Sequence, residues 1–405
     1  MPNYALEVQF FNTFILRPEA SNRVYIEESR IKGGYNEDFV NIGPKAHLVD
    51  ENYSETRRDN ALIYSGVYNS RTDVNKTNVF NAAENITRSV DPANGSITKL
   101  HAEDTNLNIL QEDKVSYALI DKDALFTAEG GQLTASGAKV IGQVVPYLGK
   151  YGCQNPESFA IKGARKYFAD KSRGAILRLS RDGITEISAA GMRDYFKDNL
   201  KLADKVVGGY DDSADEYVVS LQGSNISNTY DTLTYDETVK GWVSFYNYKP
   251  DFMFSLNKEF YSLYHNNIWE HYSNNHYNTF YKETVSATVT FVANGNPSDV
   301  KNFTAINYEG SPGWEMVGSN TDYGSYATTV LPSTNTISGD IVSRFTDKEG
   351  KYYSQLMNTG AGGLGMIAGV GISGIKGTTA NVTMKHSSIN EVELFTVSHN
   401  ITISS

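Results

Sequence analysis

The serines and acidic residues of this 405-residue chain are the first candidates for catalysis, but their spacing does not match a hydrolase. A nucleophilic serine needs a positioned histidine and acid, and the G-x-S-x-G turn that presents such a serine does not occur. With 47 Asp and Glu residues, carboxylate pairs are unavoidable, so pairs alone do not indicate a glycosidase. The turn at 180–184, SRDGI, departs from the S-x-D-x-G-x-x-W turn of sialidases and lacks its tryptophan. We therefore predict that the protein is not an enzyme and has no catalytic residues.

Phosphate and metal sites need patterns that the chain offers only in part. The glycine-rich run 360–366 does not lead into the Gly-Lys-Ser/Thr of a P-loop, because Lys376 is followed by glycine. His265, His271 and His276 are close in sequence, and in a hairpin the first two could face each other. Zinc takes three or four converging ligands, and exposed hairpin residues are the simpler interpretation. The sequence thus predicts no metal and no cofactor.

Aromatic side chains are unusually frequent, with 27 Tyr and 18 Phe against 3 Trp. A dense group lies in one segment and comprises Tyr246, Tyr248, Tyr261, Tyr264, Trp269, Tyr272, Tyr277 and Tyr281. Stacked aromatic faces bind sugars, but packing between sheets or against a neighbouring subunit is the more frequent use of such rings. From this group we take Tyr261, Tyr264, Trp269 and Tyr272 as candidates for a glycan-binding site or a subunit interface.

Alternation of polar and apolar residues, ended by Asp, Gly and Asn turns, predicts strands over most of the chain. The Asp182-Gly183 pair between apolar alternations is a strong hairpin signal. From about residue 96, groups of short strands recur at spacings of about 45 to 50 residues, which is typical of propeller blades. A pair of stacked β-sandwiches is the alternative. The predicted fold class is all-β, with a β-propeller-like body of short antiparallel strands, an N-terminal arm and a small C-terminal β domain.

Composition shifts and turn clusters divide the chain into three predicted parts: an N-terminal β arm at 1–59, a propeller-like β body at 60–330 and a C-terminal β domain at 331–405. One helix is predicted at 189–200, with Ser188 as its N-cap. The closing segments 393–397 and 400–403 could pair with the N-terminal strand and close a ring. The arm and the glycine-rich run 360–375 would then be natural docking elements.

The net charge of −11 is spread over the chain without a long run of like charges. Such a surface repels nucleic acid and gives no basic stripe that would neutralise phosphates. The start of the chain has Glu7 within its apolar stretch and is not a signal peptide, and no segment is apolar enough to span a membrane. The single Cys153 cannot form an intrachain disulfide and is expected to be buried. We expect a soluble protein made in the cytoplasm.

Five stretches of the sequence carry a family resemblance. They are YIEESRIKGGYN at 25–36, NALIYSGVYNSRT at 60–72, VDPANGSITKL at 90–100, EDKVS at 112–116 and NPESFAIKGARKYFADKSRGAILRLSRDGITEIS at 155–188. In these stretches the chain resembles the muzzle-type tail proteins of crAss-like phages and related structural proteins of phages that infect cyanobacteria. Its rhythm of short strands and tight turns is also similar to that of nozzle proteins of short-tailed phages.

The resemblance implies a structural protein of the virion tail, part of a nozzle or muzzle around the DNA exit channel. It implies a propeller-like body and, as partners, copies of the chain itself in a ring and other tail or portal-proximal virion proteins. Genomic DNA would pass without specific binding, and the family has no catalytic residues to carry over. This chain is shorter than many muzzle proteins. The alternative is an adhesion module of the tail that binds a host surface glycan, and a glycan-cleaving propeller is a third hypothesis.

Overall fold

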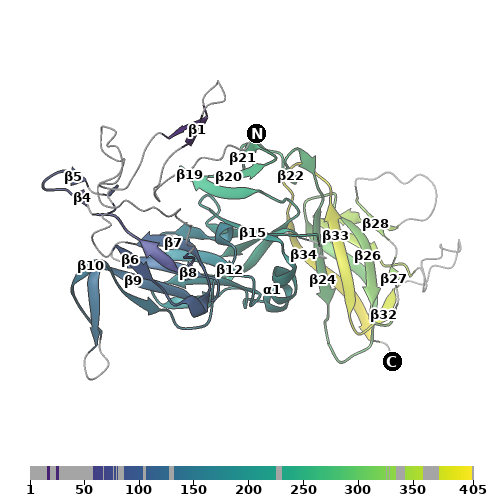
Figure 1. Ribbon diagram of the computed structural model, residues 1–405. Coiled ribbons are helices and arrows are strands. Elements are labelled where there is room, and N and C mark those ends of the chain that lie inside the picture. The colour runs from purple at the N-terminus through teal and green to yellow at the C-terminus, as the bar shows by residue number, and fades with distance from the viewer. Residues whose placement is uncertain are drawn as a thin grey trace. The chain divides into compact units, whose positions relative to one another are not determined.

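Short antiparallel strands make up nearly all of the regular structure (Figure 1). The computed structural model describes residues 16–18, 24–26 and 58–403, apart from 67, 76, 79, 81–85, 104–105, 127–131, 225–229, 325, 328, 334–342 and 359–373. The all-β prediction is confirmed. The chain forms two compact units, Met1–Ile268 and Trp269–Ser405. This division is coarser than the three parts predicted at 1–59, 60–330 and 331–405, which stay predictions.

Three four-stranded sheets follow one another in the first unit, and in each sheet every strand pairs with the next strand of the chain. We call them the first, second and third meanders. Their strands are β7 (Ile97–Glu103), β8 (Asn106–Gln111), β9 (Val115–Phe126) and β10 (Gln132–Pro146); β11 (Ala160–Lys162), β12 (Arg165–Asp170), β13 (Ala175–Ser180) and β14 (Gly183–Glu186); and β15 (Lys205–Asp211), β16 (Glu216–Gln222), β17 (Thr232–Asp236) and β18 (Gly241–Tyr246). The predicted recurrence of short-strand groups is therefore present as consecutive meanders.

A fourth sheet has three strands, β19 (Phe252–Leu256), β20 (Glu259–Tyr264) and β21 (Asn267–Glu270). The turn between β19 and β20 has positive φ at Asn257 and Lys258, as a two-residue hairpin turn of type I′ requires. The chain passes from the first unit to the second within β21. Four successive sheets resemble propeller blades in strand order, but the described residues show no closed propeller.

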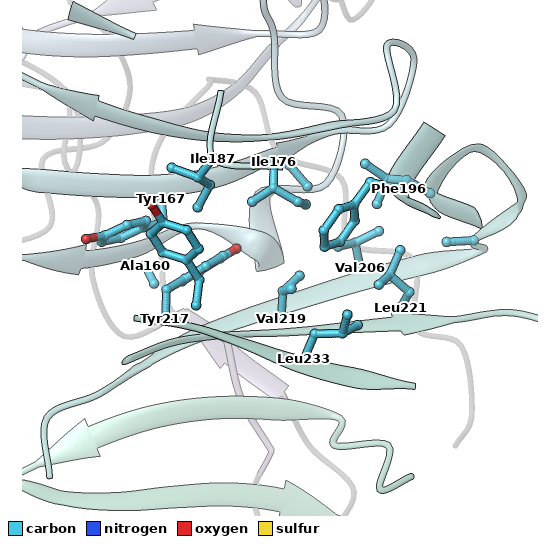
Figure 2. Close-up of a cluster of buried hydrophobic side chains, with 14 of the residues drawn as sticks. Ala160, Tyr167, Ile176, Ile187, Phe196, Val206, Tyr217, Val219, Leu221 and Leu233 are labelled. Atoms are coloured by element: carbon cyan, nitrogen blue, oxygen red, sulfur yellow. The ribbon is translucent and has the colours of Figure 1, made fainter. Parts of the chain in front are cut away.

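The second and third meanders share one core, which Figure 2 shows in close-up. One side of it is a stack of tyrosines: the Tyr167 ring lies 4.9 Å from that of Tyr217 and 5.5 Å from that of Tyr210. The Tyr217 hydroxyl donates a hydrogen bond to the Ser158 carbonyl at 2.8 Å. The third meander comes so close here that a Cβ on Gly208 would lie 2.2 Å from the same carbonyl oxygen. The two meanders are thus held by interlocking aromatic faces.

The first and second meanders meet around a buried carboxylate. Asp170 is fully buried and accepts hydrogen bonds from the backbone N–H of Gly152 at 2.9 Å and from the Arg173 guanidinium at 3.0 Å. Gln154 donates to Asp170 and to the carbonyl of Glu112 in the first meander. A Cβ on Gly152 would lie 2.0 Å from that carbonyl oxygen, so the two backbones touch.

Replacing Gly152 with alanine should lower the free energy of unfolding by about 2 kcal/mol, because the methyl group would push apart two backbones that cannot yield. The midpoint of chemical denaturation measures this change. Gly318→Ala is the matched control, since a Cβ at Gly318 meets nothing within 4 Å and its φ is not in the left-handed region. Equal effects of the two substitutions would contradict the prediction.

Helix α1 (Arg193–Asn199) lies within the predicted helical segment but begins later, with Met192 at its N-cap. The prediction that Ser188 caps the helix is wrong. Ser188 is buried, and its hydroxyl accepts the N–H of Ile176 and donates to Glu186. Gly191, with φ of 77°, then turns the chain before the helix begins. Short 3-10 turns lie at Pro92–Asn94, Pro156–Ser158 and Leu200–Leu202.

Small two-stranded sheets precede the meanders. They pair β1 (Leu16–Pro18) with β2 (Val24–Ile26), β3 (Ala61–Ile63) with β6 (Thr87–Ser89), and β4 (Tyr68–Asn69) with β5 (Val74–Asn75). Apart from β1 and β2, residues 1–57 of the predicted arm, including its first predicted strand, lie outside the described residues. So does most of the glycine-rich run 360–375.

Two sheets enclose the core of the second unit. One has the order β24 (Ala287–Ala293), β33 (Ala380–His386), β26 (Glu315–Thr321), β28 (Val330–Leu331) and β29 (Ser343–Arg344), with β27 (Tyr326–Ala327) beside β26. The other has the order β30 (Thr346–Lys348), β31 (Lys351–Gln355), β25 (Lys301–Gly310) and β32 (Ile375–Gly377), with β34 (Leu394–Ile403) beside β25. A hairpin of β22 (Thr279–Phe280) and β23 (Glu283–Thr284) precedes them.

The closing strand β34 pairs with β25. Its apolar residues Leu394, Val397 and Ile401 pack against the core of the second unit. This packing holds the strand in place. The N-terminal segment named in the prediction lies outside the described residues.

His399 of β34 makes the second unit sensitive to acid. Its ring lies 6.0 Å from those of Phe291 and Phe303, and its buried Nε2 has no hydrogen-bond partner among the described residues. Burial lowers the pKa of His399 to about 4, below the value near 6.5 of an unfolded chain. The folded state therefore prefers neutral His399, and this preference is fully present above pH ~6.5.

Lowering the pH from about 6.5 to about 4 should remove up to about 2 kcal/mol of stability from the second unit, because the unfolded chain takes up a proton first. Thermal unfolding at a series of pH values measures the loss. His399→Phe should flatten the profile in this window, because it removes the group that titrates. A profile that His399→Phe does not alter would refute the assignment.

Candidate functional site

A buried lysine ties the first meander to the second. Lys166 has a side chain only 3% exposed, and its ammonium group contacts the Glu103 carboxylate and the Ala164 carbonyl. Glu103 also accepts a hydrogen bond from Asn108, which in turn accepts one from the Tyr147 hydroxyl at 2.8 Å. Every polar member of this group has a partner, so the group is built to hold two sheets together.

The electrostatics of this group follow from the ion pair and from burial. The hydrogen bond from Lys166 lowers the pKa of Glu103. Burial lowers the pKa of the neighbouring His101, and the positive charge of Lys166 lowers it further. Burial raises the pKa of Tyr147 to about 12. Near neutral pH the carboxylate is therefore charged and the phenol is neutral, which keeps the ion pair intact.

A second ion pair joins the second and third meanders. The Arg178 guanidinium lies 2.9 Å from the Glu237 carboxylate, whose side chain is 9% exposed. Glu237 also accepts the hydroxyl of Tyr167 at 2.8 Å. Burial and this hydrogen bond raise the pKa of Tyr167 well above its usual value. The stacked tyrosines are thus anchored at their polar end to a carboxylate of the next meander.

Tyr261 and Tyr264, the first two aromatic candidates, belong to β20 in the first unit. The Tyr261 ring stacks on Phe254 of β19, with centroids 5.6 Å apart and planes 19° apart. Tyr264 stacks on His265, with centroids 4.0 Å apart. Both tyrosines are half-buried, so each offers part of one ring face to solvent.

Trp269 and Tyr272 belong to the second unit. Trp269 is half-buried, packs edge-on against Tyr281 at 5.4 Å, and has the ammonium group of Lys282 5.8 Å from its ring centroid. Tyr272 is 66% exposed. The four candidates are therefore divided between two units, two in each, and their role as a glycan site or an interface stays a prediction.

The candidate metal ligands are also divided, since His265 is in the first unit and His271 and His276 are in the second. In the part of the chain that the structure describes, no three His, Cys, Asp or Glu side chains are grouped so that they could hold a metal ion. Cys153 is buried as predicted, and burial raises its pKa to about 12. No described helix is long and apolar enough to cross a bilayer.

Sequence reasoning missed the residues that tie the meanders. Lys166 stands within the run Arg165–Asp170, where four of the following side chains are buried, and a charge in such a strand is a usable signal for a buried partner. The partners Glu103 and Glu237 are distant in sequence and gave no such signal.

Two family models match the chain in succession. The model described as Crassvirus muzzle protein matches residues 44–267, which are more than half of the chain. The chain belongs to the Crassvirus muzzle protein family. The model described as Crassvirus muzzle protein C-terminal domain matches residues 275–359. The muzzle family match ends beside Ile268, where the first unit ends, and the C-terminal match lies within the second unit.

The resemblance noted in the sequence is thereby confirmed. A curated relative, the muzzle protein of Bacteroides phage crAss001, is 22% identical over 232 residues. These residues are 55% of this chain and 16% of that protein. The chain thus corresponds to a small part of the length of this muzzle relative.

Proposed function

We propose that the chain is a structural, non-enzymatic component of a tailed-phage virion, located in the tail muzzle or nozzle around the DNA exit channel. The observation that carries the proposal is the succession of two muzzle family matches along the chain, each within one compact unit. The chain would be made in the host cytoplasm and then built into the particle.

The ion pairs between the meanders support the proposal of a rigid structural body. Lys166 with Glu103, and Arg178 with Glu237, are ion pairs between sheets that exclude much of the solvent. The group around Lys166 is fully hydrogen-bonded, and such a group favours one packing arrangement over others, whereas the buried Nε of Arg178 has no hydrogen-bond partner among the described residues. We propose that the four successive sheets form a propeller-like body, because their strand order within each sheet is that of a blade.

The proposed partners are copies of the chain in a ring and other tail or portal-proximal virion proteins. A ring requires heterologous contacts that close around an axis. The net charge of −11 would let genomic DNA pass without specific binding. In a gel-shift assay at physiological salt, double-stranded DNA should migrate unchanged with the purified protein.

Gradient-purified virions test the proposal. Peptides of this chain should be found in the particles, and gold-labelled antibodies against it should mark the tail end. Label spread over the capsid shell, or absence of the chain from mature particles, would contradict the proposal.

A second candidate function is adhesion to a host surface glycan, favoured by the exposed ring of Tyr272 and the partly exposed Trp269. Stacked aromatic rings would contact sugar faces. Trp269→Ala with Tyr272→Ala should then abolish adsorption to host cells while virions still assemble. Unchanged adsorption by such particles would exclude this function.

A further inference from the structure

Among the residues that the structure describes, the closing strand β34 lies at an edge of its sheet. Over Leu394–Ile403 it pairs with β25, and among the described residues no strand pairs with its other side. These ten residues contain no charged residue and no proline. Natural proteins guard an exposed edge with lysines, prolines, bulges or short strands, because an unguarded edge recruits another strand. The composition of β34 therefore suits a strand that is covered by another chain.

The sequence of β34 is self-complementary about His399. If the strand meets a second copy of itself in antiparallel fashion with His399 at the centre, Thr396 faces Thr402 and Val397 faces Ile401. Ser398 then faces Asn400. These three facing pairs match polar with polar and apolar with apolar, which is how cross-strand pairs stabilise a sheet.

The two ends of the strand strengthen this match. Phe395 is 68% exposed and Ile403 is 64% exposed, although both are large apolar side chains. In the His399-centred register, Ile403 of each copy reaches the bulge of the other, where Phe395 is the extra residue between Leu394 and Thr396. The pairing would therefore remove from water, in two symmetric contacts, the apolar side chains that the single chain leaves in solvent.

The other open edge of the second unit, β24, lacks this symmetry. It is also uncharged over Ala287–Ala293 and pairs on one side with β33. Antiparallel self-pairing about its central Thr290 would place Thr288 opposite Val292, a polar residue against an apolar one. The match thus distinguishes β34 from another edge strand that has no charged residue and no proline.

We propose that two copies of this chain associate through β34, antiparallel and with a two-fold axis at His399. The sheet of β31, β25 and β34 continues across the axis into the second copy. The contact is isologous, since the same strand serves on both sides. It goes beyond the proposed function, because it depends on the edge of the second unit and not on a place in the virion.

The His399-centred register can be tested with two variants of the full chain that differ in one residue and are expected to dimerise differently. Thr396 and Thr402 are both exposed and face each other across the axis. Thr396→Lys with Thr402→Lys places lysine against lysine twice, whereas Thr396→Lys with Thr402→Glu places lysine against glutamate twice. Sedimentation equilibrium over about 1 to 100 µM protein should show a dimer of the unaltered chain.

The dimer dissociation constant should rise at least about tenfold in the Lys/Lys variant and stay within about threefold of the unaltered value in the Lys/Glu variant. The matched control, Thr288→Lys with Val292→Lys, puts two charges on the edge of β24 and should leave dimerisation unchanged. A chain that is monomeric throughout, equal behaviour of the Lys/Lys and Lys/Glu variants, or loss of the dimer in the β24 control would each overturn the proposal. None of these results bears on whether the chain is found in virions, so the two proposals fail separately.

Discussion

Replacing Tyr217 with alanine is expected to lower the free energy of unfolding of the first unit by about 3 to 5 kcal/mol, because it leaves a cavity where a large ring was fully buried. Tyr217 is fully buried, and its ring stacks on Tyr167 at 4.9 Å with planes 14° apart. Figure 2 shows it beside Tyr167 and Ala160, in the core that the second and third meanders share. Denaturant unfolding followed by circular dichroism measures the loss.

Tyr217→Phe separates the ring from the hydroxyl. It keeps the stacking and removes only the hydrogen bond to the Ser158 carbonyl, so it should cost about 1 to 2 kcal/mol. The alanine and phenylalanine variants should therefore differ by at least about 1 kcal/mol. If they are equally unstable, the hydroxyl and not the ring holds the meanders together, and the stacking argument is wrong.

Replacing Lys166 with alanine should cost about 3 kcal/mol, because it leaves the Glu103 carboxylate without its cation between two sheets. The value is at the lower end for a broken buried pair, since the Glu103 side chain is 32% exposed and water can reach part of it. The same denaturant unfolding measures this change.

A surface lysine provides the matched control. Lys162 pairs with Asp212 at 2.8 Å, but its side chain is 38% exposed, so Lys162→Ala should cost less than about 1 kcal/mol. The double variant Lys166→Met with Glu103→Leu should regain most of the stability lost in Lys166→Ala, since both charges are gone. If Lys166→Ala and Lys162→Ala lower the free energy of unfolding equally, burial does not determine how much an ion pair contributes to stability.

The protein family and the antiparallel hairpins could be predicted from the sequence. The Asp182-Gly183 pair predicted a hairpin, and the structure has one there: β13 and β14 are joined at Arg181 and Asp182, and Gly183 is the first residue of β14. The stretch 155–188, which carries the resemblance, lies within the muzzle family match. The Ser188 cap failed because a serine before a helical run satisfies the same local pattern whether it caps the helix or bonds a neighbouring strand.

The sequence by itself determined that this protein is built of antiparallel hairpins and belongs with phage muzzle proteins, because strand period, turn residues and family motifs are all local in the chain. Only the tertiary structure decided which distant strands pair, as β25 does with β34, and which charges become buried, as Lys166 and Glu103 do. Alternation tells which face of a strand is apolar but not which strand it will meet. That choice depends on the fit of whole sheets around a core, and many loop closures cost nearly the same free energy.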